Sequence, residues 1–229
     1  IKQEYFTDKT AKYFKKLLKG KHVFIDLPGH GKSRINDQEI PSIDHMVESV
    51  IAVLSKEGIE DFDVIGHSMG GYVALGLKDR MPKCRRIVLL NSNYWSDPPK
   101  KQKDRERVAQ IAFASKSYFL QEAIPNLFSD PKKHQKEIGL LISEAKLMSS
   151  EAISYSSLAM KNRRNMSGIL NKRDYLIIHG ALDNHIQKKQ FDIEAVGKYN
   201  FHEIEGAGHM CHIEKSGQVI DILVSYLRS

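Results

Sequence analysis

Short apolar runs alternate with longer amphipathic stretches along most of the chain. Residues 42–58 place their apolar side chains at helical spacing, and this stretch ends at Gly58, a pattern that predicts a helix. Further helices are predicted over 69–80, 186–198 and 214–228. The apolar runs between them predict buried strands at 22–26, 62–66, 85–91, 174–180 and 200–206. This alternation favours an α/β fold, with a mostly parallel sheet covered by helices on both faces.

The stretch 97–165 breaks this alternation, because it contains no strand-like run and its pattern predicts several helices. A helical block between two strands of an α/β domain is most simply an insertion. Ligands of open α/β sheets bind at the carboxyl ends of the strands, and an insertion that leaves from such an end is placed to act as a lid. We therefore expect a core formed by 1–96 and 166–229 and a helical cap formed by 97–165.

Composition narrows the class of protein. The chain has 229 residues and a formal net charge of +7, and its length fits one domain with an insertion. Its densest basic run, 100–108, is interrupted by acids at helical spacing, which is typical of a solvated helix face. We therefore expect no nucleic-acid partner.

Two further patterns bear on the compartment. The sequence has neither an apolar run of the roughly 20 residues that a membrane span needs nor the apolar stretch of a secretory signal at the start. Its two cysteines, Cys84 and Cys211, lie far apart, so they form no disulfide framework. Together these patterns predict a cytoplasmic protein without a membrane span.

The sequence Gly66-His67-Ser68-Met69-Gly70 fits the pattern G-x-S-x-G at a predicted strand–turn–helix junction. That motif presents a serine hydroxyl on a sharp turn, and flanking glycines are expected where neighbouring backbone comes too close for side chains. The following helix directs its N-terminus at the serine, so it favours an anion there. We therefore predict Ser68 as a nucleophile and the Met69 N–H as one oxyanion donor.

A serine needs a base, and the base needs an acid to orient it. Asp183 and His209 each follow a predicted strand end, and the order Ser68, Asp183, His209 is that of an α/β-hydrolase triad. Asp97 is the one rival acid. Two other histidines are predicted to be structural: His67 pointing away across the turn, and His179 packing at a strand end.

Two further patterns resemble ligand sites and are rejected. A possible metal cluster is formed by His209, Cys211, His212 and Glu214, but their close spacing fits no common ligand pattern. The segment "DLPGHGKS" (26–33) ends like a phosphate loop, but Asp26 stands where the first glycine is required. We expect neither a metal nor another cofactor.

Several motifs together resemble the α/β-hydrolase superfamily, in particular its small lid-bearing bacterial esterase-like members. They are "DLPGHGKS", "GHSMGGYVAL", "RRIVLLNS", "HGALD" and "GAGHM", with "IPNLFS" and "LAMKNRRN" inside the cap. The resemblance implies cleavage of small carboxylic esters or thioesters through an acyl-serine. It also implies pocket walls from the cap and from Asn93, Tyr94 and Trp95, and cap residues Phe113, Phe119 and Leu127 are expected to set acyl-chain preference.

Two other functional hypotheses stay open beside that of an esterase. A cofactor-free lyase or a C–C hydrolase would use the same triad, and a non-catalytic binding protein would share the fold. Because one fold hosts many chemistries, the acyl group, the alcohol and the oligomeric state are not predicted.

The resemblance also raises an expectation about the N-terminus. Family members carry two or three strands and a His-Gly loop before the helix that matches residues 7–18, and this sequence opens almost directly on that helix. We expect these strands to be absent from the chain given, with a gap roughly 5 Å wider than normal strand spacing between 22–26 and 62–66. The second oxyanion donor would be absent with them.

Overall fold

The computed structural model describes residues 20–35, 40–170, 175–197 and 200–228. Its centre is a parallel sheet of four strands in the order β1-β2-β3-β4. The strands are β1 (Phe62–His67), β2 (Cys84–Leu90), β3 (Tyr175–Gly180) and β4 (Phe201–Ile204). His67 pairs with Leu90, and Gly180 pairs with Ile204, so the carboxyl ends of the strands lie along one edge.

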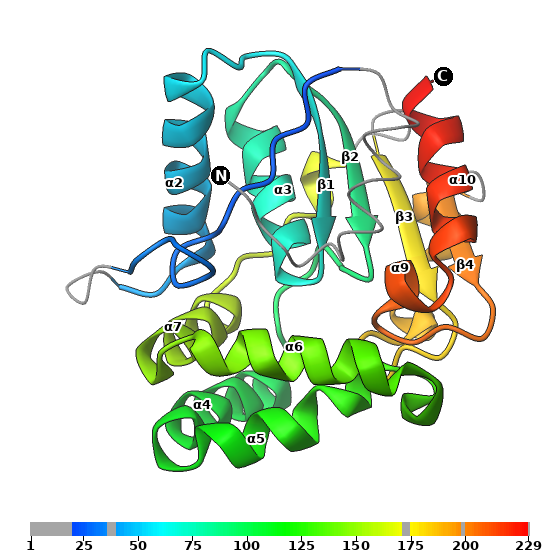
Figure 1. Ribbon diagram of the computed structural model, residues 1–229. Coiled ribbons are helices and arrows are strands. Elements are labelled where there is room, and N and C mark those ends of the chain that lie inside the picture. Colours follow the sequence, from blue (N-terminus) through cyan, green and yellow to red (C-terminus); the bar gives the residue numbers. More distant parts are fainter. Residues whose placement is uncertain (1–19, 36–39, 171–174, 198–199, 229) are drawn as a thin grey trace.

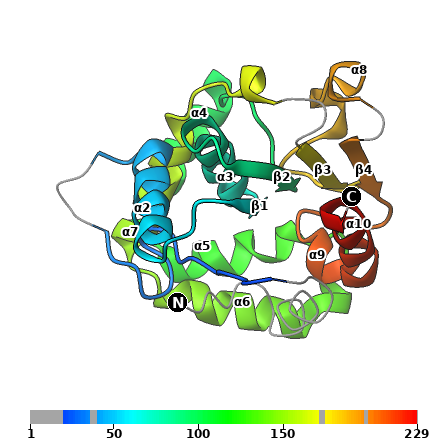
Figure 2. The same ribbon diagram turned by 90° about the horizontal axis from the view of Figure 1, so that it is seen from above.

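Helices cover both faces of the sheet, as predicted (Figures 1 and 2). One face carries α3 (Met69–Arg80), with α2 (Ile43–Lys56) beside it, and the opposite face carries α9 (Cys211–Glu214) and α10 (Ser216–Arg228). Successive residues of a strand point to opposite faces. Accordingly, Ile87 and Leu89 pack in one cluster with α3, and Val88 and Leu90 pack in another with α10.

The segment 97–165 is helical, as predicted, and forms a layer at the carboxyl ends of the strands (Figure 1). Its helices are α4 (Pro99–Ala114), α5 (Lys116–Ala123), α6 (Gln135–Leu147) and α7 (Ser150–Lys161), with short 3-10 turns η1 (Pro125–Leu127) and η2 (Pro131–His134). These elements bury a cluster of their own, to which the core adds Met210. The layer therefore has its own packing and still contacts the core.

Three sequence predictions differ from the structure. Residues 22–26 form no strand, and the prediction of a buried run is wrong here, because Val23 is exposed and Phe24 and Ile25 are only half-buried. Among the strands that the structure describes, β1 has β2 as its neighbour. The helix predicted over 186–198 is reduced to η4 (Lys188–Gln190), a 3-10 turn, and α8 (Ile193–Val196). Its buried residues Ile186, Phe191 and Val196 are spaced by five and not by three or four.

The third difference is a helix boundary: the helix predicted over 214–228 is α10, which begins only at Ser216, because Lys215 (φ −134°, ψ 45°) separates it from the short helix α9. The helix that the sequence predicts at 7–18 lies outside the described residues. The expected absence of N-terminal strands stays a prediction. Across the ranges that the structure describes, no helix combines the length and the apolar character needed to cross a bilayer.

Candidate active site

Ser68 lies on the sharp turn between β1 and α3. Its backbone has φ +50° and ψ −116°, a strained conformation for a residue with a side chain. A Cβ on Gly66 would overlap the carbonyl of Gly70, and one on Gly71 would overlap the Ser92 hydroxyl, whereas one on Gly70 would meet nothing within 4 Å. The glycines that sterics require at this turn are therefore Gly66 and Gly71, and the expected requirement at Gly70 is wrong.

The three predicted triad residues lie in one hydrogen-bonded chain. His209 Nε2 lies 2.9 Å from Ser68 Oγ, and His209 Nδ1 lies 2.8 Å from Asp183 Oδ2. Asp183 and His209 are buried, while Ser68 is half-buried. Because an ionised carboxylate only accepts hydrogen bonds, the imidazole carries its proton on Nδ1. The lone pair of Nε2 is then available to the Ser68 hydroxyl.

Asp183 is held as a carboxylate by several donors. The backbone N–H groups of His185 and Ile186 donate to Oδ1 at 2.8 and 3.1 Å, and Asn91 Nδ2 donates to Oδ2 at 2.9 Å. Burial alone would raise the pKa of Asp183, but the hydrogen bonds from His209, Asn91 and His185 outweigh it and hold the pKa well below its usual range. The acid is therefore ionised at neutral pH.

Asn91 is a site residue that the sequence reasoning missed. It follows β2 directly, is fully buried and has φ +43°. Its Nδ2 also donates to the carbonyl of Gly208 at 3.2 Å, so it braces both Asp183 and the loop of His209. The sequence contained one signal that could have predicted Asn91 as a site residue. It is a polar residue at the carboxyl end of an apolar run, and ligands of α/β sheets bind at such strand ends.

His67 does not point away from the site, in contrast to the prediction. Its Nε2 donates to the carbonyl of His209 at 2.9 Å, and its ring lies 5.2 Å from the His209 ring and 4.5 Å from the His212 ring, measured between centroids. The sequence could not show this contact, because the two residues are 142 positions apart. Burial lowers the pKa of His67 to about 4 and that of His212 well below its usual range. Both rings are therefore neutral at pH 7.

Lowering the pH is expected to reduce the free energy of unfolding through the buried rings of His67 and His212. An unfolded histidine binds its proton near pH 6.5, whereas folded His67 binds it near pH 4. Between these two pH values the unfolded state holds more protons than the folded state. The free energy of unfolding therefore decreases as the pH is lowered, by about 1.4 kcal/mol per pH unit for each such proton. Urea unfolding from pH 7 to pH 4.5 measures this slope, and His67→Gln should flatten it. If the free energy of unfolding of His67→Gln depends on pH as steeply as that of the wild type, the lowered pKa of His67 is contradicted.

The other predicted residues have different surroundings. His179 packs against the rings of Phe191 and Phe201, as predicted. The rival acid, Asp97, is ion-paired with Arg163 at 2.7 Å and with Arg105 at 3.1 Å, and His209 is bonded to Asp183 instead. Asp97 therefore pairs with Arg105 on α4 and with Arg163 after α7, whereas His209 pairs with Asp183.

The suspected metal cluster is not arranged for a metal. Within the described ranges, no group of three or more His, Cys, Asp or Glu side chains is placed to hold an ion. His209 is bonded to Ser68 and Asp183, whereas Glu214 accepts hydrogen bonds from Ser129 and Gly208. The side chains of His209 and Glu214 are therefore bonded to residues outside this cluster.

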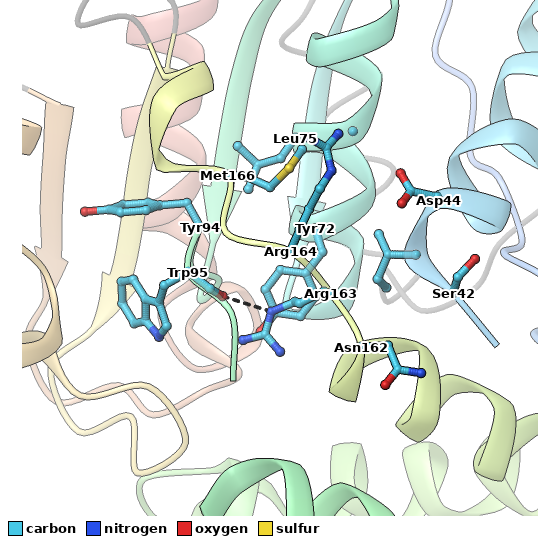
Figure 3. Close-up of a pocket in the computed structure, with 12 residues that line it drawn as sticks. Ser42, Asp44, Tyr72, Leu75, Tyr94, Trp95, Asn162, Arg163, Arg164 and Met166 are labelled. Atoms are coloured by element: carbon cyan, nitrogen blue, oxygen red, sulfur yellow. Dashed lines mark hydrogen bonds between the residues drawn. The ribbon is translucent and has the colours of Figure 1, made fainter. Parts of the chain in front are cut away.

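Asn93, Tyr94 and Trp95 follow β2 and pack beside Tyr72 and Phe191. Asn93 is buried against the Tyr72 hydroxyl, and the ring of Trp95 lies 4.9 Å from that of Phe191. Tyr94 and Trp95 line a small cavity of about 40 Å³ (Figure 3), which none of the three triad residues lines. Their role as substrate contacts stays a prediction. Met69 is the first residue of α3, where an N–H has no partner within the helix.

The sequence matches the model of the alpha/beta hydrolase family over residues 4–222, and the chain therefore belongs to this family. A curated relative is the dihydrolipoyllysine-residue acetyltransferase component of the acetoin cleaving system of Pseudomonas putida, 26% identical over 216 residues. The match covers 90% of this chain and 56% of that protein. The chain thus spans little more than half the length of this relative.

Two solved structures of esterases are similar to the chain. The thermophilic esterase from Thermogutta terrifontis has a TM-score of 0.79 at 22% identity, over 89% of this chain and 78% of that one. The esterase from Exiguobacterium antarcticum has a TM-score of 0.80 at 16% identity, over 97% and 88%. At these identities the likeness shows the alpha/beta hydrolase fold.

Proposed function

We propose that the chain is a serine hydrolase that cleaves small carboxylic esters or thioesters through an acyl-serine intermediate. The observation that carries this proposal is the hydrogen-bonded chain Ser68–His209–Asp183 at 2.9 and 2.8 Å. A serine with this base and a buried carboxylate behind it is the arrangement that activates a hydroxyl for attack on an acyl carbon. We place the reaction in the cytoplasm, with no cofactor.

In the proposed reaction each group has its own role. His209 Nε2 removes the Ser68 proton as the hydroxyl attacks the carbonyl, and the same proton then goes to the leaving alcohol or thiol. Asp183 keeps the imidazole oriented and stabilises it while it is charged. The N–H of Met69, at the N-terminus of α3, donates to the oxyanion. Water then attacks the acyl-serine with His209 again acting as the base, which releases the acid and restores Ser68.

A small panel of nitrophenyl esters with graded acyl chains tests the proposal. We expect hydrolysis of at least the short esters, and loss of that activity in Ser68→Ala. A fluorophosphonate probe should add its mass to the peptide that contains Ser68 in the wild type and not in the variant. A folded wild-type protein that is not labelled would contradict the serine mechanism and would favour the binding-protein alternative. Labelling without turnover of any ester or thioester would instead favour the lyase or C–C hydrolase alternative.

We further propose that residues 97–165 act as a lid that sets acyl-chain preference. Leu127 and Phe119 are half-buried in the cap cluster, whereas Phe113 is 59% exposed on α4. Because the Phe113 side chain is largely exposed, we do not propose that it sets acyl-chain preference. Leu127→Ala should change the ratio of kcat/KM between long and short esters by roughly tenfold, the scale of lost methylene contacts.

Phe113→Ala, in the same cap and with its side chain in solvent, is the matched control and should leave that ratio unchanged. If Leu127→Ala and Phe119→Ala both leave the ratio at its wild-type value, the cap does not form the wall of the acyl pocket.

A further inference from the structure

Side chains from three parts of the molecule hold the backbone on either side of His209. Asn91 donates to the carbonyl of Gly208 at 3.2 Å, and His67 donates to the carbonyl of His209 at 2.9 Å. The amide of Gly208 donates to Glu214 Oε2 at 2.7 Å. Three consecutive peptide groups around His209 are therefore each fixed by a side chain. Asn91 and His67 come from the ends of core strands, whereas Glu214 lies on α9.

Glu214 differs from the other two because its second carboxylate oxygen reaches the cap. Oε1 accepts hydrogen bonds from the backbone N–H of Ser129 at 2.8 Å and from its hydroxyl at 2.5 Å. Ser129 lies between η1 and η2, 85 residues before Glu214 in the chain. Hydrogen bonds to an ionised carboxylate are roughly twice as strong as neutral ones. One half-buried side chain thus joins the cap to the loop of His209.

The backbones of the cap and this loop are also in direct contact. A Cβ placed on Gly208 would lie 2.7 Å from the Ser129 nitrogen and 2.9 Å from the Leu127 carbonyl oxygen. The Ser129 hydroxyl lies 3.1 Å from the carbonyl of Gly206. In Figure 1, the segment that joins α5 to α6 lies at the same end of the molecule as α9. A displacement of the cap at this point therefore acts on Gly208, the residue before His209.

We infer that Glu214 is a positioning residue that couples the seating of the cap to the placement of the His209 imidazole. With the cap seated, both carboxylate oxygens have donors, and the Gly208 amide is held in place. Loss of the hydrogen bonds from Ser129 leaves Glu214 Oε1 without these donors, and the carboxylate then holds the Gly208 amide less firmly. The His209 ring then loses its fixed distance to Ser68, and a misplacement of about 1 Å is enough to cost roughly 10²-fold in rate. The inference rests on the proposed function.

Two variants remove hydrogen bonds between Glu214 and Ser129, one by a change on α9 and the other by a change in the cap. Glu214→Gln keeps one acceptor oxygen and presents an amide N–H to a backbone donor, and Ser129→Ala removes only the hydroxyl in the cap. We expect the rate constant for fluorophosphonate labelling of Ser68 to fall about 10- to 100-fold in the first and about 3- to 10-fold in the second. Glu205→Gln, an exposed acid in the same loop, should leave it unchanged.

The double variant separates coupling from two independent effects. Once Glu214→Gln has broken the link, adding Ser129→Ala should slow labelling little further, whereas independent effects would multiply. If the double variant slows labelling by the product of the two single effects, the inference is overturned. Unchanged labelling in Glu214→Gln, with only a lower unfolding temperature, also overturns it, because the residue would then be merely structural.

A third variant tests the junction sterically. Gly208→Ala forces the Leu127–Ser129 backbone away from the loop and should slow labelling like Glu214→Gln. Gly217→Ala, where a Cβ meets nothing within 4 Å, is its control. Amide exchange of the loop 205–210 needs no activity, and it should speed up in Ser129→Ala although that change lies in the cap. Unaltered exchange overturns the coupling, whereas a wild type that is not labelled at Ser68 refutes the proposed function alone.

Discussion

His209→Ala is expected to lower kcat/KM for ester hydrolysis by about 10⁴- to 10⁶-fold, the scale of removing the base of a serine triad. The imidazole is bonded to both Ser68 and Asp183, so its loss leaves the hydroxyl without a proton acceptor and the carboxylate without its partner. Steady-state hydrolysis of the best nitrophenyl ester from the panel measures the change. Single-turnover labelling of Ser68 should fall in parallel, because acylation needs the same base.

The control for this change is His202→Ala on β4, a histidine at the sheet and outside the triad, which should keep kcat/KM within a few-fold of wild type. A His209→Ala protein that is folded by circular dichroism and retains more than about a tenth of the wild-type rate would refute the assignment of the base. Asp183→Asn should cost about 10³- to 10⁴-fold, because the amide favours the wrong tautomer of the imidazole.

Asp97→Ala is expected to lower the free energy of unfolding by about 3–5 kcal/mol, as does removal of one partner from other buried ion pairs. Arg163 Nη2 lies 2.7 Å from Asp97 Oδ1, and both side chains are 5% exposed. Burial alone would raise the pKa of Asp97, but Arg163 and Arg105 outweigh it and lower the pKa, so the acid is charged. Its removal leaves two cations, one of them buried, without their anion.

Urea unfolding at pH 7 measures this effect, and Asp104→Ala is the matched control. Asp104 is also an acid paired with an arginine, but its pair with Arg107 is exposed on α4 and should be worth about 0.5 kcal/mol or less. A loss of stability in Asp97→Ala no larger than in the control would mean that the buried pair does not hold the cap to the core. Esterase activity per folded molecule should change far less than in His209→Ala, because Asp97 does not contact the triad.

Arg163 also shows how the two ends of the cap are brought together. It follows α7, and Asp97 precedes α4, so their pair joins the start of the helical layer to its end. The guanidinium also donates to the Trp95 carbonyl at 3.1 Å and lies 4.1 Å from the centre of the Tyr72 ring (Figure 3). Nothing in the local sequence around Arg163 predicted these contacts, because each partner is far away along the chain.

The sequence by itself determined the class of fold and the order of the strands and helices of its core, except at 22–26, at 186–198 and at the short helix α9. The continuous apolar run of β2, buried from Ile87 to Leu90, and the helical spacing in α2 are local patterns, and local patterns survive in a linear sequence. The glycine–serine turn and the two polar loops after later strands predicted the residues that meet at the candidate site, because the carboxyl ends of parallel strands lie along one edge.

The tertiary structure alone decided which side chains support that site. His67, Asn91 and Glu214 reach the loop of His209 across 142, 117 and 6 positions of sequence, and Glu214 reaches Ser129 across 85. It also decided that Asp97 binds Arg163 whereas His209 binds Asp183, and that residues 22–26 are not a strand. The physical reason is common to all of these. Hydrogen bonds, ion pairs and strand ladders need a partner at about 3 Å in a fixed direction, and the partner is set by packing and not by neighbours along the chain.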